Sequence, residues 1–417
     1  MQINQPASHY DIVVIGAGMV GASFAQFLNN ELRNTKLSIL VVEAVAPASS
    51  EQPSFDARST ALSFGSRKIF ERMGVWESLA EHTAPIQKIQ VSDRGHFGSA
   101  WLDCAEHNQD ALGYVLENRQ LGAVLNPILQ QAAGIDYLAP AKISAVKPEQ
   151  KCMRLSVDCC AESGDAETEK QYDVQANLVV LADGGRSPIS GQLGISQNRT
   201  DYEQQALIAN IAFEKAHENV AYERFTEQGP LAVLPLNDFE NQHRGALVWT
   251  LRKEQVPVIN EMNEEEVLAA LNEQFGQRLG RITQIGKRFN YPLSLSVANE
   301  QVRPHLVLLG NVAHTLHPVA GQGLNLALRA VESLVEALIE GVKSGNAPGD
   351  MVVLQPYFES RSDDQRNTIA LTDKMIKVFS TAKLAPALSR KAGLLAVDLL
   401  PGVRKGFGRQ AMGLQSW

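Results

Sequence analysis

Four residues near the N-terminus, Gly16, Gly18, Gly21 and Glu43, have the types and spacing to bind a dinucleotide. The glycines follow a β-branched apolar run and precede a helical pattern, and Glu43 ends the next apolar run, about 20 residues later. In such a loop the first glycine makes a tight turn, the second lets a pyrophosphate approach, and the third lets helix and strand pack closely. A carboxylate at Glu43 accepts hydrogen bonds from ribose hydroxyls and repels a 2′-phosphate. The pattern predicts a dinucleotide site, against the alternative of a glycine-rich turn without a ligand.

A late stretch, "GNVAHTLHPVAGQGLNLALR" at 310–329, places flexible backbone where a helix begins. Pro318, Gly321 and Gly323 precede a helical pattern that starts near Leu324. The first N–H groups of a helix have no partner within it, and the helix dipole makes that end positive. Glycines let a ligand come close to those groups. We expect an anion or an electron-rich ring to bind here, against the alternative of an ordinary glycine-rich helix start.

Composition narrows the function classes. The 417 residues are 44% hydrophobic and 20% charged, which is typical of a globular protein with a sizeable core. The net charge of −8 does not favour nucleic acid, which is usually bound by a basic domain. The four cysteines show no metal-ligand spacing, and the N-terminus lacks the basic start of a signal peptide. We therefore expect a reduced, cytoplasmic protein without a transmembrane helix.

The order of apolar patterns predicts a discontinuous α/β domain. Strand and helix patterns alternate in three separated segments, and short strands dominate the chain between the second and the third. The predicted division is a nucleotide-binding domain over 1–75, 110–186 and 286–345, a β-rich substrate domain over 76–109 and 187–285, and a C-terminal helical segment over 346–417.

Three motifs together give the chain a family resemblance. They are "GAGMVG" at Gly16–Gly21, Asp183 and Gly184 in "LADGGRS", and Gly310 and Asn311 in "LLGNVAHTLHPVAGQGLN". With this spacing over nearly the whole chain, it resembles the single-component FAD-dependent aromatic hydroxylases. The resemblance implies the p-hydroxybenzoate hydroxylase fold, a Rossmann-like FAD-binding domain with an inserted β-rich substrate domain.

Further stretches make the chain similar to the ubiquinone-biosynthesis hydroxylases. They are "FDARSTALS", "VSDRGHFG", "YERFTEQGPLAVLP", "GKRFNYPL" and "HTLHPVAGQGLNLALR". The match is best to the 2-polyprenyl-6-methoxyphenol hydroxylase branch, which also has Asn after Gly in the third motif. The wider family has an Asp there, which accepts hydrogen bonds from the ribityl chain of FAD. Asn311 accepts through its carbonyl without charge, so we expect weaker FAD retention than in relatives with Asp.

The resemblance also assigns roles to the late stretch. The amides of Gly323 and Leu324 would meet the negative charge of reduced flavin, and Gly321 and Asn325 belong to the same cofactor contact. The carbonyl of Pro318 would lie close to the reactive edge of the flavin. His317 beside the ring is either a proton-handling residue or a packed histidine.

Three further residues have both a functional and an ordinary interpretation. In similar proteins an arginine at Arg58 reaches the flavin–pyrophosphate region; the alternative is a surface arginine. Arg119 either pairs with the pyrophosphate or is solvated on a helix face. Asp183 either contacts the cofactor or forms a turn with the glycines that follow it. His314 lies three residues before His317, but no third ligand accompanies the pair, so we expect no metal site.

The resemblance implies a reaction cycle. NAD(P)H reduces FAD while visiting it transiently, O₂ adds to the reduced flavin, and a C4a-hydroperoxide hydroxylates an electron-rich phenol ring. The substrate would be a polyprenylated phenol that enters from the β-rich insert. Two alternatives stay open: an FAD-dependent reductase or dehydrogenase of prenyl lipids that does not use O₂, and a non-catalytic FAD-binding subunit of a quinone-synthesis complex.

The C-terminal segment 383–417 is basic in an otherwise acidic protein. It contains six Lys and Arg residues and a single acidic residue, Asp398, and leucines recur between the basic residues at helical spacing. Such a segment can lie on anionic lipid, where a polyprenylated phenol resides. It either docks the enzyme on the inner membrane face or on a partner in a quinone-synthesis complex, or it packs on the FAD domain as a helical cap.

Overall fold

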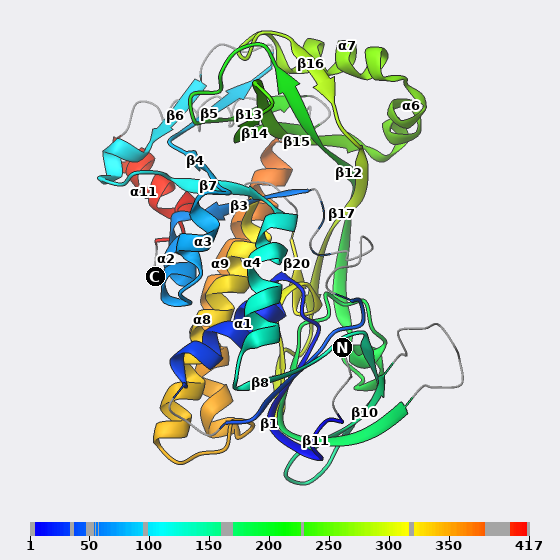
Figure 1. The fold of residues 1–417 in the computed structure, drawn as a ribbon. Helices are drawn as coiled ribbons and strands as arrows, with labels where there is room; N and C mark the ends of the chain where they lie inside the picture. The colour runs from blue at the N-terminus through cyan, green and yellow to red at the C-terminus, as the bar shows by residue number, and fades with distance from the viewer. Residues whose placement is uncertain are drawn as a thin grey trace.

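The computed structural model describes residues 5–33, 37–46, 54, 56, 58–94, 99–159, 170–226, 229–316, 321–379 and 401–414. Two large sheets and one small sheet surround a layer of long helices (Figure 1). Within these ranges, no helix has the length and apolar character needed to cross a membrane.

The first sheet has eight strands in the order β18-β19-β11-β1-β2-β8, with β10 paired to β11 and β9 to β10. Its strands are β1 (His9–Ile15), β2 (Ile39–Val42), β8 (Ile135–Leu138), β9 (Ala141–Pro148), β10 (Met153–Cys159), β11 (Lys170–Leu181), β18 (Val302–Arg303) and β19 (Leu306–Leu308). The run β8-β2-β1-β11-β19 is parallel. Parallel strands are buried on both faces, which explains the continuous apolar runs in β1 and β2.

The helices and short 3₁₀ turns complete the layers. They are α1 (Met19–Glu31), α2 (Phe64–Arg72), α3 (Trp76–Ala80), η1 (Cys104–His107), α4 (Asn118–Gln131), α5 (Ile189–Gln192), η3 (Lys253–Gln255), α6 (Val256–Glu261), α7 (Glu264–Phe275), η4 (Gly310–Val312), α8 (Gln322–Lys343), α9 (Met351–Phe379) and α11 (Pro401–Ala411). Helices α1, α4 and α8 cover one face of the first sheet, where Val14, Phe24 and Leu328 share a core. On the other face, Val13 of β1 shares the second core with Ile143 of β9, Leu155 of β10 and Ile189 of α5.

The second large sheet has nine strands in the order β20-β17-β12-β15-β14-β13-β5-β6, with β16 paired to β12. Its strands are β5 (Lys88–Asp93), β6 (Ser99–Asp103), β12 (Gln197–Phe213), β13 (Val220–Thr226), β14 (Gly229–Phe239), β15 (Gln242–Arg252), β16 (Ile282–Ile285), β17 (Phe289–Ala298) and β20 (His314–Thr315). The β13–β5 pair is parallel, and the other pairs are antiparallel. Helix α7 packs on the outer face of this sheet, around Val267, Leu271 and Phe275.

A three-stranded sheet joins the two large ones. It has the order β3-β7-β4, from β3 (Ser59–Ser63), β7 (Gly113–Glu117) and β4 (Ala84–Ile86). Strands β4 and β7 contact β14 of the nine-stranded sheet, and α2 follows directly on β3. The small sheet therefore fixes the substrate-side sheet against the helices that begin at the glycine motifs.

Strand β17 shows how the chain crosses between the two lobes. It lies inside the range 286–345, which the sequence assigns to the nucleotide-binding domain, yet it pairs with β12 from Phe289 to Ala298. Figure 1 shows β12 and β17 running together from the lobe of β10 and β11 to the lobe of α7. The apolar pattern of a strand does not tell which sheet it joins, so such a crossing strand cannot be assigned from the sequence.

The last described segment packs on the protein. Helix α11 contacts β6 and η1, and Arg404 Nε lies 2.9 Å from Glu106 Oε2. Met412 is fully buried, and its carbonyl accepts a hydrogen bond from the N–H of Gly65 at 2.8 Å. The structure thus supports the cap interpretation for residues 401–414, whereas the basic residues Lys383, Arg390 and Lys391 lie outside the described part of the chain.

Candidate functional site

The first glycine loop connects β1 to α1 and is too tight for side chains. Gly16 has φ +96°, and a Cβ there would lie 2.8 Å from both the carbonyl oxygen of Ala182 and the Cα of Asp183. A Cβ on Gly21 would lie 2.0 Å from the carbonyl oxygen of Gly16. Both glycines are required by backbone packing, and the loop brings Asp183 of the second motif against Gly16.

Gly18 has a different reason to be glycine. It has φ −66° and precedes the first residue of α1, so its backbone conformation is open to any residue. A Cβ there would lie 2.8 Å from Ser54 Oγ. The space beside Gly18 is therefore narrow, as expected where a pyrophosphate must reach the N-terminal N–H groups of α1.

The carboxylate of Glu43 is held at the edge of this loop. Its Oε2 accepts a hydrogen bond from the N–H of Ala17 at 2.6 Å, and its Oε1 accepts one from the N–H of Val45 at 3.0 Å. The side chain is buried at the end of β2. Each carboxylate oxygen keeps a lone pair for another donor, so Glu43 can accept from ribose hydroxyls without losing its anchors.

Asp183 uses its side chain to build the turn of the second motif. Its Oδ1 accepts from the N–H of Gly185 at 2.9 Å, and its Oδ2 accepts from the N–H and the hydroxyl of Ser187. Gly184 and Gly185 both have positive φ, at +71° and +74°. The side chain of Asp183 therefore forms the turn, which was one of its two predicted roles. The backbone of Asp183 lies against the first glycine loop.

The third motif lies next to the first. Gly310 has φ +72°, and a Cβ there would lie 3.0 Å from Cγ2 of Val20 on α1. Asn311 is exposed, and its carbonyl accepts a hydrogen bond from Thr315 Oγ1 at 3.1 Å. The three motifs, far apart in sequence, therefore meet around the N-terminus of α1.

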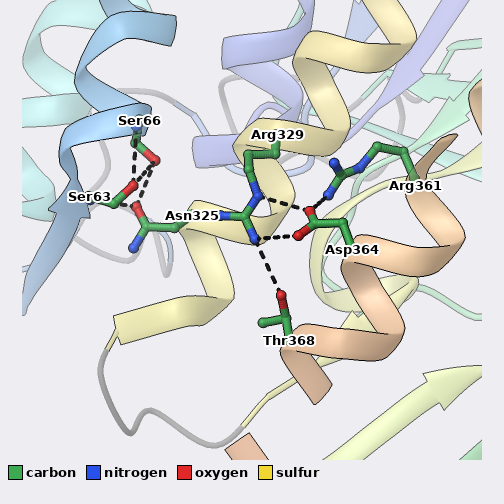
Figure 2. Close-up of polar contacts among 7 residues, drawn as sticks. All are labelled: Ser63, Ser66, Asn325, Arg329, Arg361, Asp364 and Thr368. Atoms are coloured by element: carbon green, nitrogen blue, oxygen red, sulfur yellow. Dashed lines mark hydrogen bonds and ion pairs between the residues drawn. The ribbon is translucent and has the colours of Figure 1, made fainter. Parts of the chain in front are cut away.

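The start of α8 is fixed by Asn325, as Figure 2 shows in part. Its Oδ1 accepts from the N–H of Ser63 at 2.8 Å and from the hydroxyl of Ser66 at 2.7 Å. Its Nδ2 donates to the carbonyls of Ala61 at 3.0 Å and Gly321 at 2.7 Å. Because protein groups use both ends of this amide, Asn325 positions the α8 terminus rather than offering a free side chain to a ligand.

The glycines before α8 leave room beside the backbone. Gly321 has φ +61°, and a Cβ there would lie 3.1 Å from Ala61 Cβ, whereas a Cβ on Gly323 would meet nothing within 4 Å. The N–H groups of Gly323 and Leu324 belong to the first turn of α8, which has no internal partners for them. His317 and Pro318, the expected catalytic residues, lie outside the described part of the chain.

Arg58 and Arg119 are brought together beside the small sheet. Arg58 Nε lies 2.6 Å from Asp56 Oδ2, and its guanidinium lies 4.7 Å from the ring centroid of Tyr291. The N–H of Arg119 donates to the carbonyl of Asp56 at 2.9 Å, and its guanidinium pairs with Glu117. Arg119 is half exposed and Arg58 is largely covered. The contacts with Tyr291 and Glu117 place the two arginines at the junction between the lobes.

Glu117 is a polar centre of this junction that sequence reasoning missed. Its carboxylate is buried at the end of β7 and pairs with Arg244 of β15 at 2.6 Å as well as with Arg119. Its Oε1 also accepts from Asn210 of β12 at 3.1 Å. The available signal was a single acid ending an apolar run in "GYVLEN", but the sequence alone does not show that β12 and β15 face it.

A second missed cluster lies behind the third motif, between α8 and α9 (Figure 2). Asp364 accepts from Arg329 Nε at 2.9 Å and also pairs with Arg361, while Arg329 donates to Thr368 Oγ1 at 3.4 Å. Burial lowers the pKa of both arginines to about 10. One carboxylate thus bridges two buried cations and ties α9 to the helix that starts at the glycine motif.

His314 lies in the same region and is buried without polar contacts. Neither ring nitrogen has a hydrogen-bond partner within the described residues. Burial, and then the charges of Arg361 and Arg329, lower the pKa of His314 to about 4. In the described ranges no group of His, Cys, Asp and Glu side chains has the arrangement of a metal site.

Because the pKa of His314 is low, the free energy of unfolding depends on pH below neutrality. Below the ordinary histidine pKa of about 6.5, His314 binds a proton in the unfolded chain, whereas in the folded chain it does so only at about pH 4. We expect the free energy of unfolding to fall over that window by on the order of 3 kcal/mol from this group. Urea unfolding at pH 7 and pH 4.5 should show a smaller loss in His314→Leu than in wild type. An equal loss would contradict the expectation, and His82→Gln, at a half-exposed site, serves as the control.

The residues present fit FAD. The loop of Gly16, Gly18 and Gly21 offers a narrow cradle at a helix N-terminus, and Glu43 is held beside it with acceptor capacity to spare. FAD carries a ribityl chain and a flavin ring beyond its pyrophosphate, so one loop cannot contact all of it. The second and third motifs supply the continuation, and the open backbone at Gly323 can face a flat ring.

Comparison with known proteins agrees with this geometry. The family model described as "FAD binding domain" matches residues 9–369. The chain is 32% identical over 404 residues to a ubiquinone hydroxylase, UbiL, of Rhodospirillum rubrum, covering 97% of this chain and 89% of the relative. It is 28% identical to the 3-demethoxyubiquinol 3-hydroxylase of Escherichia coli, covering 99% of this chain and all of the relative.

The solved structure of p-nitrophenol 4-monooxygenase from Pseudomonas putida shares the fold. It has a TM-score of 0.77 at 18% identity, covers 99% of this chain and is itself covered completely. The expected p-hydroxybenzoate hydroxylase-like fold, with its β-rich substrate-side sheet, is thereby confirmed. The chain belongs to the FAD-binding-domain family and, within it, to the FAD-dependent aromatic hydroxylases that include the ubiquinone-biosynthesis enzymes.

Proposed function

We propose that this enzyme hydroxylates the ring of a polyprenylated phenol in ubiquinone biosynthesis, using FAD, NAD(P)H and O₂. The observation that carries the proposal is the meeting of the three motifs around α1, through Gly16 with Asp183 and Gly310 with Val20. Relatives named as ubiquinone hydroxylases match over nearly the whole chain, which supports a ubiquinone precursor as the substrate. The Asn after Gly in the third motif favours a precursor of the 2-polyprenyl-6-methoxyphenol type.

The protein's own residues hold and orient the reactants. Bound FAD supplies the activation of O₂ with electrons from NAD(P)H, which is chemistry that side chains lack. The N–H groups of Gly323 and Leu324 stabilise negative charge on the cofactor ring, by up to about 2 kcal/mol for a partly buried helix terminus. Glu43 would orient the ribose, and the nine-stranded sheet would help to keep water from the ring.

Asn311 provides a test of the cofactor's position. We expect Asn311→Asp to retain FAD at least as tightly as wild type, because a charged acceptor forms a stronger hydrogen bond with ribityl hydroxyls. The side chain is exposed, so the added charge carries little burial cost. Flavin fluorescence during dialysis gives the dissociation constant. A clearly weaker affinity in Asn311→Asp would place Asn311 away from the ribityl chain.

Oxygen uptake tests the proposed activity against its two alternatives. A hydroxylase consumes O₂ with NADPH or NADH faster when a short-chain prenylphenol is added, and the product gains a hydroxyl group. A reductase of prenyl lipids would oxidise NAD(P)H without consuming O₂. A non-catalytic FAD-binding subunit would show neither activity, and a variant unable to reduce its flavin would still complement a deletion strain.

We also propose peripheral membrane contact through the basic residues before α11. Three of them, Lys383, Arg390 and Lys391, would each contribute about 1 kcal/mol on anionic lipid. The triple variant with Gln at these positions should bind phosphatidylserine vesicles at least tenfold more weakly, with unchanged FAD content. A control variant replaces the exposed Lys142, Lys147 and Lys343 with Gln. Equal binding by both variants would contradict membrane contact through this segment.

A further inference from the structure

Glu223 is a carboxylate on strand β13 that none of the three motifs accounts for. Its neighbours in the strand, Tyr222 and Arg224, point to the outer face of the nine-stranded sheet. Tyr222 lies edge-on to Phe275 of α7 at 5.7 Å between ring centroids, and Arg224 Nε donates to the carbonyl of Gln274 at 2.9 Å. Because successive side chains of a strand alternate, Glu223 points to the inner face.

The residues level with Glu223 form an apolar row across the inner face. Directly paired residues of neighbouring strands share a face of the sheet. The pairings lead from Val91 through Glu223, Ala232, Val248 and Ile208 to Phe289. All six side chains are half-buried, whereas the outer face of β12, β14 and β15 packs against α6 and α7 in a buried core. The row is thus an apolar floor that the protein itself leaves partly uncovered, with one carboxylate in it.

This floor is turned toward the cofactor side of the molecule. Ala221, two residues before Glu223 and on the same face, belongs to the main core with residues of β7 and α8. Asn210, two residues after Ile208, donates to Glu117 at 3.1 Å. Tyr291, two residues after Phe289, carries the guanidinium of Arg58 at 4.7 Å from its ring centroid. The floor therefore lies across from the junction where the expected flavin-side arginines meet.

The chemical state of Glu223 fits proton transfer near neutral pH. Burial alone raises the pKa of its carboxyl group to about 7. The charged or titratable groups that the described strands and ring contacts place on this face include Asp93 at the end of β5, Arg244 with its partner Glu117, and Arg252 at the end of β15. Tyr291 with Arg58 lies there too, and Lys287 Nζ lies 5.3 Å from the ring centroid of Phe289. A base acts best when its pKa lies near the working pH.

We propose that Glu223 binds the hydroxyl group of the phenol substrate and accepts its proton as the ring is hydroxylated, with the prenyl tail lying on the apolar floor. This inference rests on the proposed function. In the step, the phenol O–H bond breaks and the proton moves to a carboxylate oxygen of Glu223, while the electron pair stays on the phenol oxygen. That pair enters the ring and makes the carbon beside the hydroxyl group more nucleophilic toward oxygen supplied by the established chemistry. The new C–O bond forms as the O–O bond of that oxygen donor breaks, and the electron pair of the O–O bond leaves with the other oxygen atom, which ends in water. The ring carbon then loses its hydrogen as a proton to that second oxygen, and the proton on Glu223 returns to the phenol oxygen as the ring regains aromaticity.

The experiment compares wild type, Glu223→Gln and Glu223→Asp with Glu218→Gln, which replaces an exposed acid just before β13. Each protein is loaded with FAD and titrated with a short-chain prenylphenol between pH 5 and 9. Ultraviolet difference spectra report the hydrogen bond between the bound phenol hydroxyl and Glu223, and product formation is measured alongside. The spectral signal does not need turnover, so it remains informative if the proposed hydroxylation fails in wild type.

In wild type and Glu218→Gln we expect the spectrum of the bound phenol to change as Glu223 titrates, because the phenol hydroxyl donates a hydrogen bond to the carboxylate only when Glu223 is ionised. In Glu223→Gln this pH-dependent spectral change should be absent, and hydroxylation should fall by roughly 10²-fold, the low end for loss of a general base. Flavin content and flavin reduction by NAD(P)H should be unchanged, and Glu223→Asp should recover part of both signals. Glu223→Gln with the wild-type pH dependence of the phenol spectrum and a wild-type pH profile of hydroxylation would overturn the assignment. If Glu223→Gln does not fold, an unshifted pH profile in Glu223→Asp would overturn it.

Discussion

Gly18→Val should yield a folded protein that lacks FAD. The backbone at Gly18 tolerates a side chain, with φ −66°, but a Cβ would lie 2.8 Å from Ser54 Oγ and would occupy the approach to the α1 N-terminus. We expect FAD affinity to fall by at least about 10²-fold, which corresponds to roughly 2.7 kcal/mol of lost binding energy. The visible spectrum of the purified protein and its titration with FAD give the measurement.

A second glycine provides the matched control. Gly191, in α5, has nothing within 4 Å of an added Cβ and no positive φ. Gly191→Val should therefore keep its flavin, with a circular dichroism spectrum like that of Gly18→Val. Stoichiometric yellow flavin in Gly18→Val would show that the pyrophosphate does not pass this glycine.

Asp364→Asn should destabilise the fold strongly. Asp364 bridges Arg329 and Arg361, whose side chains are only 16% and 14% exposed. Removing the shared carboxylate leaves two buried guanidinium groups without the counter-charge that pairs with them directly, which costs roughly 3–5 kcal/mol. Urea unfolding monitored by circular dichroism gives the change in the free energy of unfolding.

The neighbouring residue supplies the control for this expectation. Asp363 pairs with Arg366 at 2.6 Å, but both side chains are more than two-thirds exposed. Asp363→Asn should therefore cost at most about 1 kcal/mol, the usual range for a surface ion pair. Equal losses in the two variants would mean that the bridge between α8 and α9 contributes little.

The sequence predicted what depends on local spacing. Gly16, Gly21 and Glu43 lie within one strand–helix–strand unit, and the chemistry of such a unit is visible in the order of its residues. Gly310 and Gly321 have a left-handed backbone conformation. Their place in the motif could also be predicted locally, because only glycine adopts that conformation without strain. The family model and the shared fold then confirmed the FAD-dependent hydroxylase and its fold class.

What depends on contacts between distant segments could not be predicted. The side-chain oxygen of Asn325 accepts its hydrogen bonds from residues of β3 and α2, more than 250 positions earlier in the chain. The carboxylate of Glu117 is shared with Arg244 only because the fold brings this residue of β15 to the end of β7. The apolar floor around Glu223 requires the register of five strand pairs, none of which leaves a trace in the local pattern of β13.

The most direct test of the central claim follows the oxygen atom. The FAD-loaded enzyme is incubated with NADPH or NADH, a short-chain prenylphenol and isotopically labelled O₂, and the product is analysed by mass spectrometry. A flavin monooxygenase places one labelled oxygen in the new hydroxyl group of the ring and consumes NAD(P)H and O₂ in equal amounts. Product whose new hydroxyl carries unlabelled oxygen from water, or NAD(P)H oxidation with no ring hydroxylation under any of these conditions, would contradict the account.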